Sequence, residues 1–431
     1  MIARFACVLA MLVAAPAYAE LSAAERQIGE TVEAEYERSV SLLEKLVKQN
    51  SGTMNLSGVK IVGEMMRAEL EPLGFQVRWV PQAQVQRSGH LIATHQGLAG
   101  NNKLLLIAHL DTVFEKDSPF TGFVRAGEKA TGPGSGDDKG GMVVIVAALR
   151  AMHAAGTLAD ANIEIVLTGD EEDVGEPVAI ARADLIAAGK RADIALGFEG
   201  LAQLEGRDMG SIARRSSNAW TLTTSGTTGH SSLIFNQQYG DGAVFELARI
   251  LAAFRTQLPE PNLTFNVGLI AGGDEASFSA GGLQASASGK TNIIPAVAIA
   301  RGDFRTLSLE QTQRVQAKMR QIVADHAPGT DALLEFDAAS YPPMAPTEGN
   351  RALLTRMNQI NADLGLAPMG ELDPLRRGAG DISFVAPDVD GLVGMGTASE
   401  GDHAPGETVD LDSIRRQAKR AAILMTRLSR Q

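Results

Sequence analysis

The stretch Lys103-Leu-Leu-Leu-Ile-Ala-His109-Leu-Asp111 joins five consecutive apolar residues to a histidine and an aspartate. A continuous apolar run of this length is typical of a strand that is buried on both faces, as in a parallel sheet. Polar side chains that directly follow such a strand lie at the carboxyl edge of the sheet, where open α/β folds place their binding sites. The stretch therefore predicts both a central strand and the position of a site.

The same alternation of strands and helices extends to both sides of this stretch. Further strands are predicted at 75–80, 90–94, 163–168, 194–198 and 391–395. Helices are predicted at 22–49, 56–71, about 140–155, 349–364 and from about 411 onward. Apolar strands that alternate with helices predict an α/β sandwich with a largely parallel central sheet.

The pattern changes near Ser211 and returns after about residue 345. The intervening segment predicts strands and helices in the order 220–225 (strand), 240–256 (helix), 264–271 and 296–304 (strands), and 309–326 (helix). This order indicates a small α+β insert with an exposed sheet, which could pair edge to edge with a second copy. We therefore expect a discontinuous catalytic domain of residues 20–212 and 341–431, with an inserted domain of residues 213–340.

The chain begins with a segment that resembles an export signal. A basic residue, Arg4, precedes the apolar run from Phe5 to Ala15, and Ala17-Tyr-Ala19 forms a small-x-small cleavage site. These features predict a signal peptide of residues 1–19 and an exported protein, periplasmic or secreted. An uncleaved anchor is the alternative, but the apolar run is short for one. No later run is long enough to span a membrane, so we expect no membrane association after cleavage.

Composition narrows the chemistry of the mature protein. The only cysteine among the 431 residues is Cys7, inside the predicted leader. Thiol nucleophiles, disulfides and thiolate metal sites are therefore excluded, and any metal must be held by His, Asp or Glu. The net charge is −12, which argues against nucleic acid as a partner.

Polar residues gather where the predicted strands end. They are His109 and Asp111, the run Asp170 to Asp173, Glu199, the pair Asp137 and Asp138 before a predicted helix, and the late His403. Carboxylates crowded at one sheet edge repel one another unless a cation or protons offset their charge. A dinuclear metal site resolves this, and imidazole with carboxylate suits zinc, with cobalt or manganese as substitutes.

Each of these features also has a simpler interpretation. His109 alone could be a hydrogen-bonded core histidine, and the acidic run 170–173 could be a solvated turn. Asp137 and Asp138 could cap the following helix. The loop Gly132–Gly136 lacks the Gly-Lys-Ser/Thr ending of a phosphate-binding loop. Independent chance is a poor explanation for so many such features in this order, each at a strand end.

Taken together, the motifs resemble the di-zinc peptidase and deacylase family that includes glutamate carboxypeptidase, acetylornithine deacetylase and succinyl-diaminopimelate desuccinylase. The carboxypeptidase branch is the most similar. The motifs that carry the resemblance are His109-Leu-Asp111-Thr-Val, Gly134-Ser-Gly-Asp137-Asp-Lys-Gly-Gly141, Asp170-Glu-Glu-Asp173, Phe198-Glu199, Gly229-His230, Asn292-Ile-Ile-Pro295 and His403. The resemblance implies a zinc-exopeptidase-like three-layer sandwich with a mixed, largely parallel sheet, and a ferredoxin-like dimerisation or lid domain.

The resemblance also implies a role for each matched residue. His109 and Glu199 would bind one zinc ion, Glu172 and His403 the other, and Asp137 would bridge the two. Asp111 would orient His109. Glu171 would be the general base that takes a proton from water and so generates the hydroxide held between the ions. His230 would reach the active site of a partner subunit and stabilise the oxyanion, while Asn292 and Arg305 would contact the carboxylate of the substrate.

One loop departs from the family pattern. Relatives often carry Gly-Gly-Ser/Thr-Asp before the last zinc histidine, whereas this chain has Arg376-Arg-Gly-Ala-Gly-Asp381, with Gly380 in place of the hydroxyl residue. That loop shapes the substrate pocket in relatives. The expected activity is that of an exopeptidase that cleaves the amide next to a C-terminal carboxylate, with glutamate as the expected C-terminal residue. The alternatives are an N-acyl-amino-acid deacylase with the same metal chemistry and an inactive binding protein.

Overall fold

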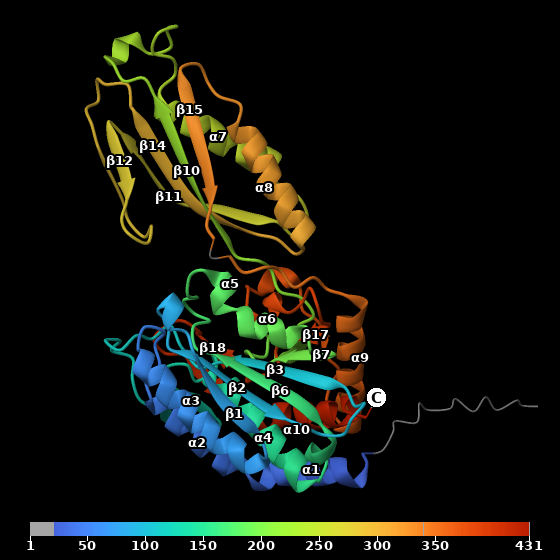
Figure 1. Cartoon of the computed structure of the whole chain (residues 1–431). Helices are drawn as coiled ribbons and strands as arrows, with labels where there is room; N and C mark the ends of the chain where they lie inside the picture. The colour runs from blue at the N-terminus through green and yellow to red at the C-terminus, as the bar shows by residue number, and fades with distance from the viewer. Residues whose placement is uncertain (1–20, 339, 431) are drawn as a thin grey trace, which may run out of the picture.

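The computed structural model describes residues 21–338 and 340–430. The predicted signal peptide, residues 1–19, lies outside the described residues. Figure 1 shows a larger α/β body and a smaller body built on an antiparallel sheet, joined by two chain crossings. The domain limits at 213 and 340 stay predictions. Within the part of the chain that the structure describes, no helix is both long and apolar enough to cross a bilayer.

A six-stranded sheet forms the centre of the larger body. Its order is β1 (Gln76–Pro81), β2 (Gly89–His95), β6 (Asn162–Thr168), β3 (Lys103–His109), β7 (Ile194–Gly197) and β17 (Gly391–Leu392). The last four strands are parallel, and β2 runs antiparallel to both of its neighbours. Because His109 lies opposite Thr168 in the register, β3 and β6 end at the same edge. The expected mixed, largely parallel sheet is confirmed.

Helices cover both faces of this sheet (Figure 1). One face of the sheet packs on α4 (Lys139–Ala154). Helix α4 in turn contacts α1 (Ala23–Ala34), α2 (Tyr36–Lys48) and α10 (Asp412–Leu428). The other helices of this body are α3 (Leu56–Leu70), α5 (Val178–Ala181), α6 (Ala183–Gly189) and α9 (Glu348–Asp363). Leu104 and Leu106 of β3 belong to the core with α4, whereas Leu105 and Ile107 belong to a second core on the opposite face. The three-layer sandwich therefore follows from the apolar run in β3.

Short strands complete the larger body. One small sheet contains β18 (Ser399–Glu400), β19 (Thr408–Asp410), β5 (Lys129–Thr131) and β4 (Val124–Ala126). Another contains β16 (Gly370–Glu371), β9 (Arg207–Gly210) and β8 (Gln203–Leu204). Strand β19 pairs with β5, so the chain before the last helix lies next to the segment that leads into α4.

Two predicted elements differ from the structure. The predicted helix over 22–49 is two helices, because Glu35 leaves helical geometry at φ −96° and ψ 10°. The predicted strand 391–395 pairs with β7 only over Gly391–Leu392, and Val393 forms an isolated bridge with Ser211. Gly394 has φ 79°, and a left-handed residue cannot continue an extended strand. The remaining predicted helices and strands of the larger body lie within a few residues of their expected positions.

The smaller body has the ferredoxin-like order of elements. Its chain runs through β10 (Asn218–Gly226), α7 (Ala243–Gln257), β11 (Thr264–Gly273), β14 (Val297–Arg305), α8 (Leu309–Val323) and β15 (Thr330–Phe336). The sheet order is β11-β14-β10-β15, antiparallel throughout, and Trp220, Leu247 and Phe304 lie in its core. Sequence patterns missed β15 and the hairpin of β12 (Glu275–Phe278) and β13 (Ala285–Ser288). Adjacent Leu333 and Leu334 obscure the alternation that marks a half-buried strand.

Candidate metal centre

Three predicted ligands converge at the carboxyl edge of the central sheet. His109 is the last residue of β3, Asp137 lies in the loop before α4, and Glu172 lies in the loop after β6. One ligand atom from each lies within 4.8 Å of the others. His109 Nε2 is 3.0 Å from Asp137 Oδ1. The cluster forms because strand ends and a helix start meet at one edge.

His403 joins this cluster from the loop between β18 and β19. Its Nε2 is 3.0 Å from Asp137 Oδ2 and 3.3 Å from Glu172 Oε2. Asp137 thus lies between two imidazole rings and turns one carboxylate oxygen to each. The His403 side chain is 56% exposed, whereas that of His109 is 2% exposed, so the cluster opens to solvent on the His403 side.

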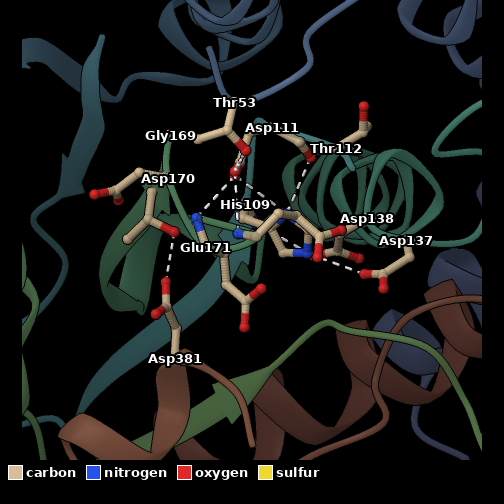
Figure 2. A network of polar contacts seen from close by, with 12 residues as sticks. Thr53, His109, Asp111, Thr112, Asp137, Asp138, Gly169, Asp170, Glu171 and Asp381 are labelled. Carbon is tan, nitrogen blue, oxygen red and sulfur yellow. Dashed lines mark hydrogen bonds and ion pairs between the residues drawn. The ribbon is translucent and has the colours of Figure 1, made fainter. Parts of the chain in front are cut away.

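Asp111 organises the residues around His109. Its carboxylate lies 3.4 Å from His109 Nδ1 and accepts hydrogen bonds from the Thr53 hydroxyl (2.7 Å) and the backbone N–H groups of Glu171 (3.0 Å) and Glu172 (3.1 Å). In Figure 2 the Glu171 side chain points away from this carboxylate. Asp111 therefore fixes both the His109 ring and the start of the loop after β6.

The electrostatics of the cluster favour a bound cation. Burial and the nearby Asp137 carboxylate raise the pKa of Glu172 to about 10, and burial and carboxylates also raise the pKa of Glu171. Burial opposes the charged form of Asp137 too, but His109 and His403 lower its pKa. The Oε1 atom of Glu172 is buried and has no hydrogen-bond partner. A divalent ion would stabilise these carboxylates and give this atom a partner, so the residues fit a metal.

Glu199 is the fifth predicted ligand, and its contact in this structure is with an arginine and not with the other four ligands. Its carboxylate forms an ion pair with the Arg214 guanidinium, and both side chains are mostly buried. A Cβ atom at Gly380 would lie 2.5 Å from Glu199 Oε1 and 2.8 Å from Arg214 Nη2. The glycine that departs from the family pattern therefore makes room for this ion pair.

The three residues predicted from the inserted domain lie in two places. His230 is exposed, and its ring accepts a hydrogen bond from the Ser232 backbone N–H. It pairs with Ile293 in an isolated bridge, next to Asn292. In Figure 1 the chain between β10 and α7, the segment that contains His230, lies at the end of the smaller body away from the larger one. Asn292 is held to this segment by a hydrogen bond of 2.9 Å from the Ser231 N–H to its carbonyl oxygen. Arg305 lies instead beside Gly378 and pairs with Asp303 at 3.2 Å.

Two of the simpler interpretations are wrong. Asp138 precedes α4, but its side chain makes no capping hydrogen bond; one oxygen accepts the His109 N–H instead. The run 170–173 is not a fully solvated turn. Asp170 is completely buried and paired with Arg182 at 2.6 Å.

Several residues that build the site were not predicted from sequence. Glu407 is buried and accepts the backbone N–H groups of Gly134 (2.9 Å), Gly136 (2.7 Å) and Asp137 (3.0 Å), which fixes the loop that presents Asp137. The sequence did contain a signal for Glu407, because this acidic residue lies only four positions after the predicted ligand His403. Arg214 and Arg182 were also missed; each pairs with an acidic residue 15 or 12 positions away and also with a residue far along the chain, Gly378 or Asp381.

A three-layer α/β sandwich with an inserted antiparallel sheet and a histidine–carboxylate cluster at the strand ends defines a metallo-hydrolase. Residues 105–427 match the family described as Peptidase family M20/M25/M40, and the chain belongs to this family. It is therefore a metallo-hydrolase that acts on peptide or N-acyl amide bonds.

Individual relatives agree with this assignment. The chain is 35% identical over 165 residues to carboxypeptidase G2 of a Pseudomonas species, a match that covers 37% of this chain and 38% of that protein. It is 27% identical over 407 residues to the succinyl-diaminopimelate desuccinylase of Acidiphilium cryptum, covering 91% of this chain and 98% of the relative.

Solved structures show the same fold. A dinuclear metal-binding M20 peptidase from Bacillus subtilis superposes with a TM-score of 0.65 at 16% identity, over 92% of this chain and 99% of the other. An M20 metallo-carboxypeptidase from Sulfolobus solfataricus gives 0.64 at 16% identity, over 91% and 99%.

Proposed function

We propose that the protein is a zinc-dependent exopeptidase that releases a C-terminal amino acid, with glutamate as the favoured residue. The observation that carries the proposal is the cluster of His109, Asp137, Glu172 and His403, with the Glu171 carboxyl close enough to interact electrostatically with His109 and Asp137. The local identity to carboxypeptidase G2 favours this branch of the family.

Two zinc ions would be held by His109 and Glu199 on one side, Glu172 and His403 on the other, with Asp137 between them. Bound zinc supplies Lewis acidity and lowers the pKa of water to roughly 7. To bind zinc, Glu199 would use its Oε1 atom, because Oε2 is paired with Arg214.

Glu171 is the proposed general base. Its backbone N–H is held by Asp111 while its side chain points away from that carboxylate (Figure 2). Burial raises the pKa of its carboxyl group, which increases its affinity for a proton. Glu171 would take a proton from the attacking water and later deliver it to the leaving nitrogen. Asp111 would keep His109 oriented throughout the reaction.

The second candidate is an N-acyl-amino-acid deacylase. The observation in its favour is the desuccinylase match, which covers 91% of this chain, whereas the carboxypeptidase match covers 37%. Both reactions cleave an amide near a carboxylate, and both would use the same metal residues and the same base.

Assembly and location complete the proposal. We propose a homodimer through the inserted domain, because Val244, Phe245 and Ile270 expose 40%, 54% and 61% of their surface there. His230 and Asn292 would then serve the site of the partner. We also propose export to the periplasm or medium, on the leader pattern of residues 1–19.

A substrate panel separates the two candidates. Purified protein should release glutamate from acyl-glutamates and from peptides with C-terminal glutamate, and a chelator should abolish release. Cleavage of N-acetyl or N-succinyl amino acids without any cleavage of peptides would favour the deacylase. Hydrolysis that survives complete metal removal would contradict both.

A further inference from the structure

The two chain segments that lead into the inserted domain pair with each other before they separate. Ser217 and Tyr341 exchange two backbone hydrogen bonds of 3.0 Å, and Arg214 and Met344 exchange two of 3.0 and 2.9 Å. We call residues 214–217 and 341–344 the connecting ribbon. Strand β10 follows one of its segments and β15 precedes the other, so the ribbon continues the chain of the inserted sheet into the larger body.

One segment of the ribbon contacts the proposed base. The Tyr341 hydroxyl donates a hydrogen bond of 2.7 Å to the backbone carbonyl oxygen of Glu171 and accepts one of 3.0 Å from Arg182. Its ring packs edge-on against Phe384, with centroids 5.0 Å apart. Since Asp111 holds the N–H of Glu171, both polar backbone groups of the base are fixed by hydrogen bonds.

Arg182 makes this contact rigid. Its guanidinium is fully buried and also binds Asp170 (2.6 Å) and Asp381 (2.7 Å), both nearly or fully buried. A satisfied buried network of this kind has little freedom to rearrange. The Tyr341 hydroxyl is therefore held at one place relative to the loop after β6.

The other segment of the ribbon contacts the proposed metal ligand. The Arg214 guanidinium pairs with Glu199 and donates to the carbonyl oxygens of Gly378 (2.7 Å) and Ala379. The connecting ribbon therefore contacts two different loops of the site. Tyr341 contacts the loop that carries the proposed base, and Arg214 contacts the loop that carries the proposed ligand Glu199.

We propose that the connecting ribbon is a positioning device, in which Tyr341 positions Glu171 and Arg214 positions Glu199, so that the orientation of the inserted sheet is transmitted to the site. The inference rests on the proposed roles of Glu171 and Glu199. Tyr341 takes part in no proton transfer, because its hydroxyl contacts the carbonyl oxygen of Glu171 rather than its carboxylate.

The test is Tyr341→Phe, which keeps the ring and removes the donor to Glu171. We expect kcat to fall about tenfold with KM changed less than about twofold and metal content unchanged, as for the loss of one hydrogen bond that aligns the base. The matched control is Tyr36→Phe. Tyr36 is also buried and donates to Glu128 at 2.5 Å, but it lies on α2. This control should keep wild-type kcat and KM.

Hydrogen exchange at the amides of Glu171 and Glu172 provides a second readout. Exchange should be faster in Tyr341→Phe and unchanged in Tyr36→Phe. Wild-type kcat in Tyr341→Phe, an equal loss in Tyr36→Phe, or unchanged exchange at these amides would overturn the proposal. Hydrogen exchange does not depend on turnover, so it tests the positioning role of Tyr341 by itself. A wild-type protein that cleaves no amide would contradict the proposed function and leave this test intact.

Discussion

His109 presents its two ring nitrogens to two different carboxylates. Nδ1 lies 3.4 Å from the Asp111 carboxylate and 3.1 Å from the Asp111 carbonyl oxygen, and Nε2 lies 3.0 Å from the Asp137 carboxylate. A ring held in this way can offer Nε2 to a metal ion while Nδ1 donates its proton to Asp111. The ring orientation therefore depends on a residue that would not touch the metal.

Replacing Asp111 with Asn should weaken metal binding. The amide keeps the size of the carboxylate but loses its charge and one acceptor, although three hydrogen-bond donors and the nearby His109 ring converge on the carboxylate in the wild type. We expect zinc affinity to fall by about 10–100-fold, measured by competition with a chromogenic chelator. Asp184→Asn, at a partly exposed position on α6, is the control. Equal zinc affinity in Asp111→Asn and the wild type would show that Asp111 does not orient the ligand.

Gly380 and Gly378 allow a matched comparison within one loop. A Cβ at Gly380 would meet the Glu199–Arg214 pair at 2.5 and 2.8 Å, whereas a Cβ at Gly378 would meet only the end of Arg305 at 3.4 Å. Overpacking of this kind costs about 1–3 kcal/mol, so we expect Gly380→Ala to lower kcat/KM by roughly tenfold or more. Gly378→Ala should stay near wild type. Similar kinetics in the two variants would contradict the close approach at Gly380.

At the scale of elements, Glu246 joins the start of α7 to the chain after α8. Its side chain is fully buried and accepts two hydrogen bonds of 2.8 Å from Arg249 and one of 3.1 Å from the Ala327 N–H. Burial alone would raise the pKa of this carboxyl, but Arg249 and the Ala327 N–H outweigh it and lower the pKa below 4.5. Its stabilising effect is therefore complete above pH 4.5 and is lost as the pH falls through the lowered value.

Glu246→Gln should consequently destabilise the inserted domain in a pH-dependent manner. At neutral pH we expect the free energy of unfolding to drop by about 1–3 kcal/mol, as for a lost hydrogen bond to a charged group. The difference from wild type should narrow as the pH falls below 4.5 toward the lowered pKa at which the native carboxyl takes up its proton. Urea unfolding of both proteins at neutral pH and below pH 4.5 measures this difference in the free energy of unfolding. A difference that does not change with pH would refute the stabilising role of the ionised Glu246 carboxylate.

The sequence predicted most of the elements that carry the cluster. The apolar run in β3 predicts burial on both faces, and Leu104 and Leu105 do lie in separate cores. His109, Asp137, Glu172 and His403 follow from motifs at the ends of elements.

The contacts that hold these residues were beyond the reach of sequence patterns. Arg214 and Tyr341 lie in irregular segments with no periodicity, and both have partners far along the chain: the Gly378 carbonyl for Arg214 and the Glu171 carbonyl for Tyr341. Charge and spacing alone cannot select such partners. The Glu35 break was also hidden, because both helices turn a continuous apolar face to the same core.

At the scale of the whole molecule, His230 lies away from the cluster of its own chain, so a shared site in the proposed dimer can be tested by mixing. His230→Ala and Glu171→Ala should each be nearly inactive alone. After subunit exchange, about a quarter of wild-type turnover should return, since half of random dimers are mixed and each has one intact site. No recovery, with exchange confirmed by sedimentation of tagged chains, would exclude action across subunits.

The role of Glu171 in metal-dependent hydrolysis is tested by comparing wild type and Glu171→Gln for metal content and turnover in the same preparation. Glu171 would accept a proton and bind no metal, whereas the neighbouring Glu172 would bind one. We predict two divalent ions per chain in both proteins and turnover lower by about 10³-fold in the variant. Turnover of the variant within about tenfold of wild type would contradict the assignment of Glu171 as the base. A wild-type protein that hydrolyses amides without bound metal would contradict the metal-dependent mechanism.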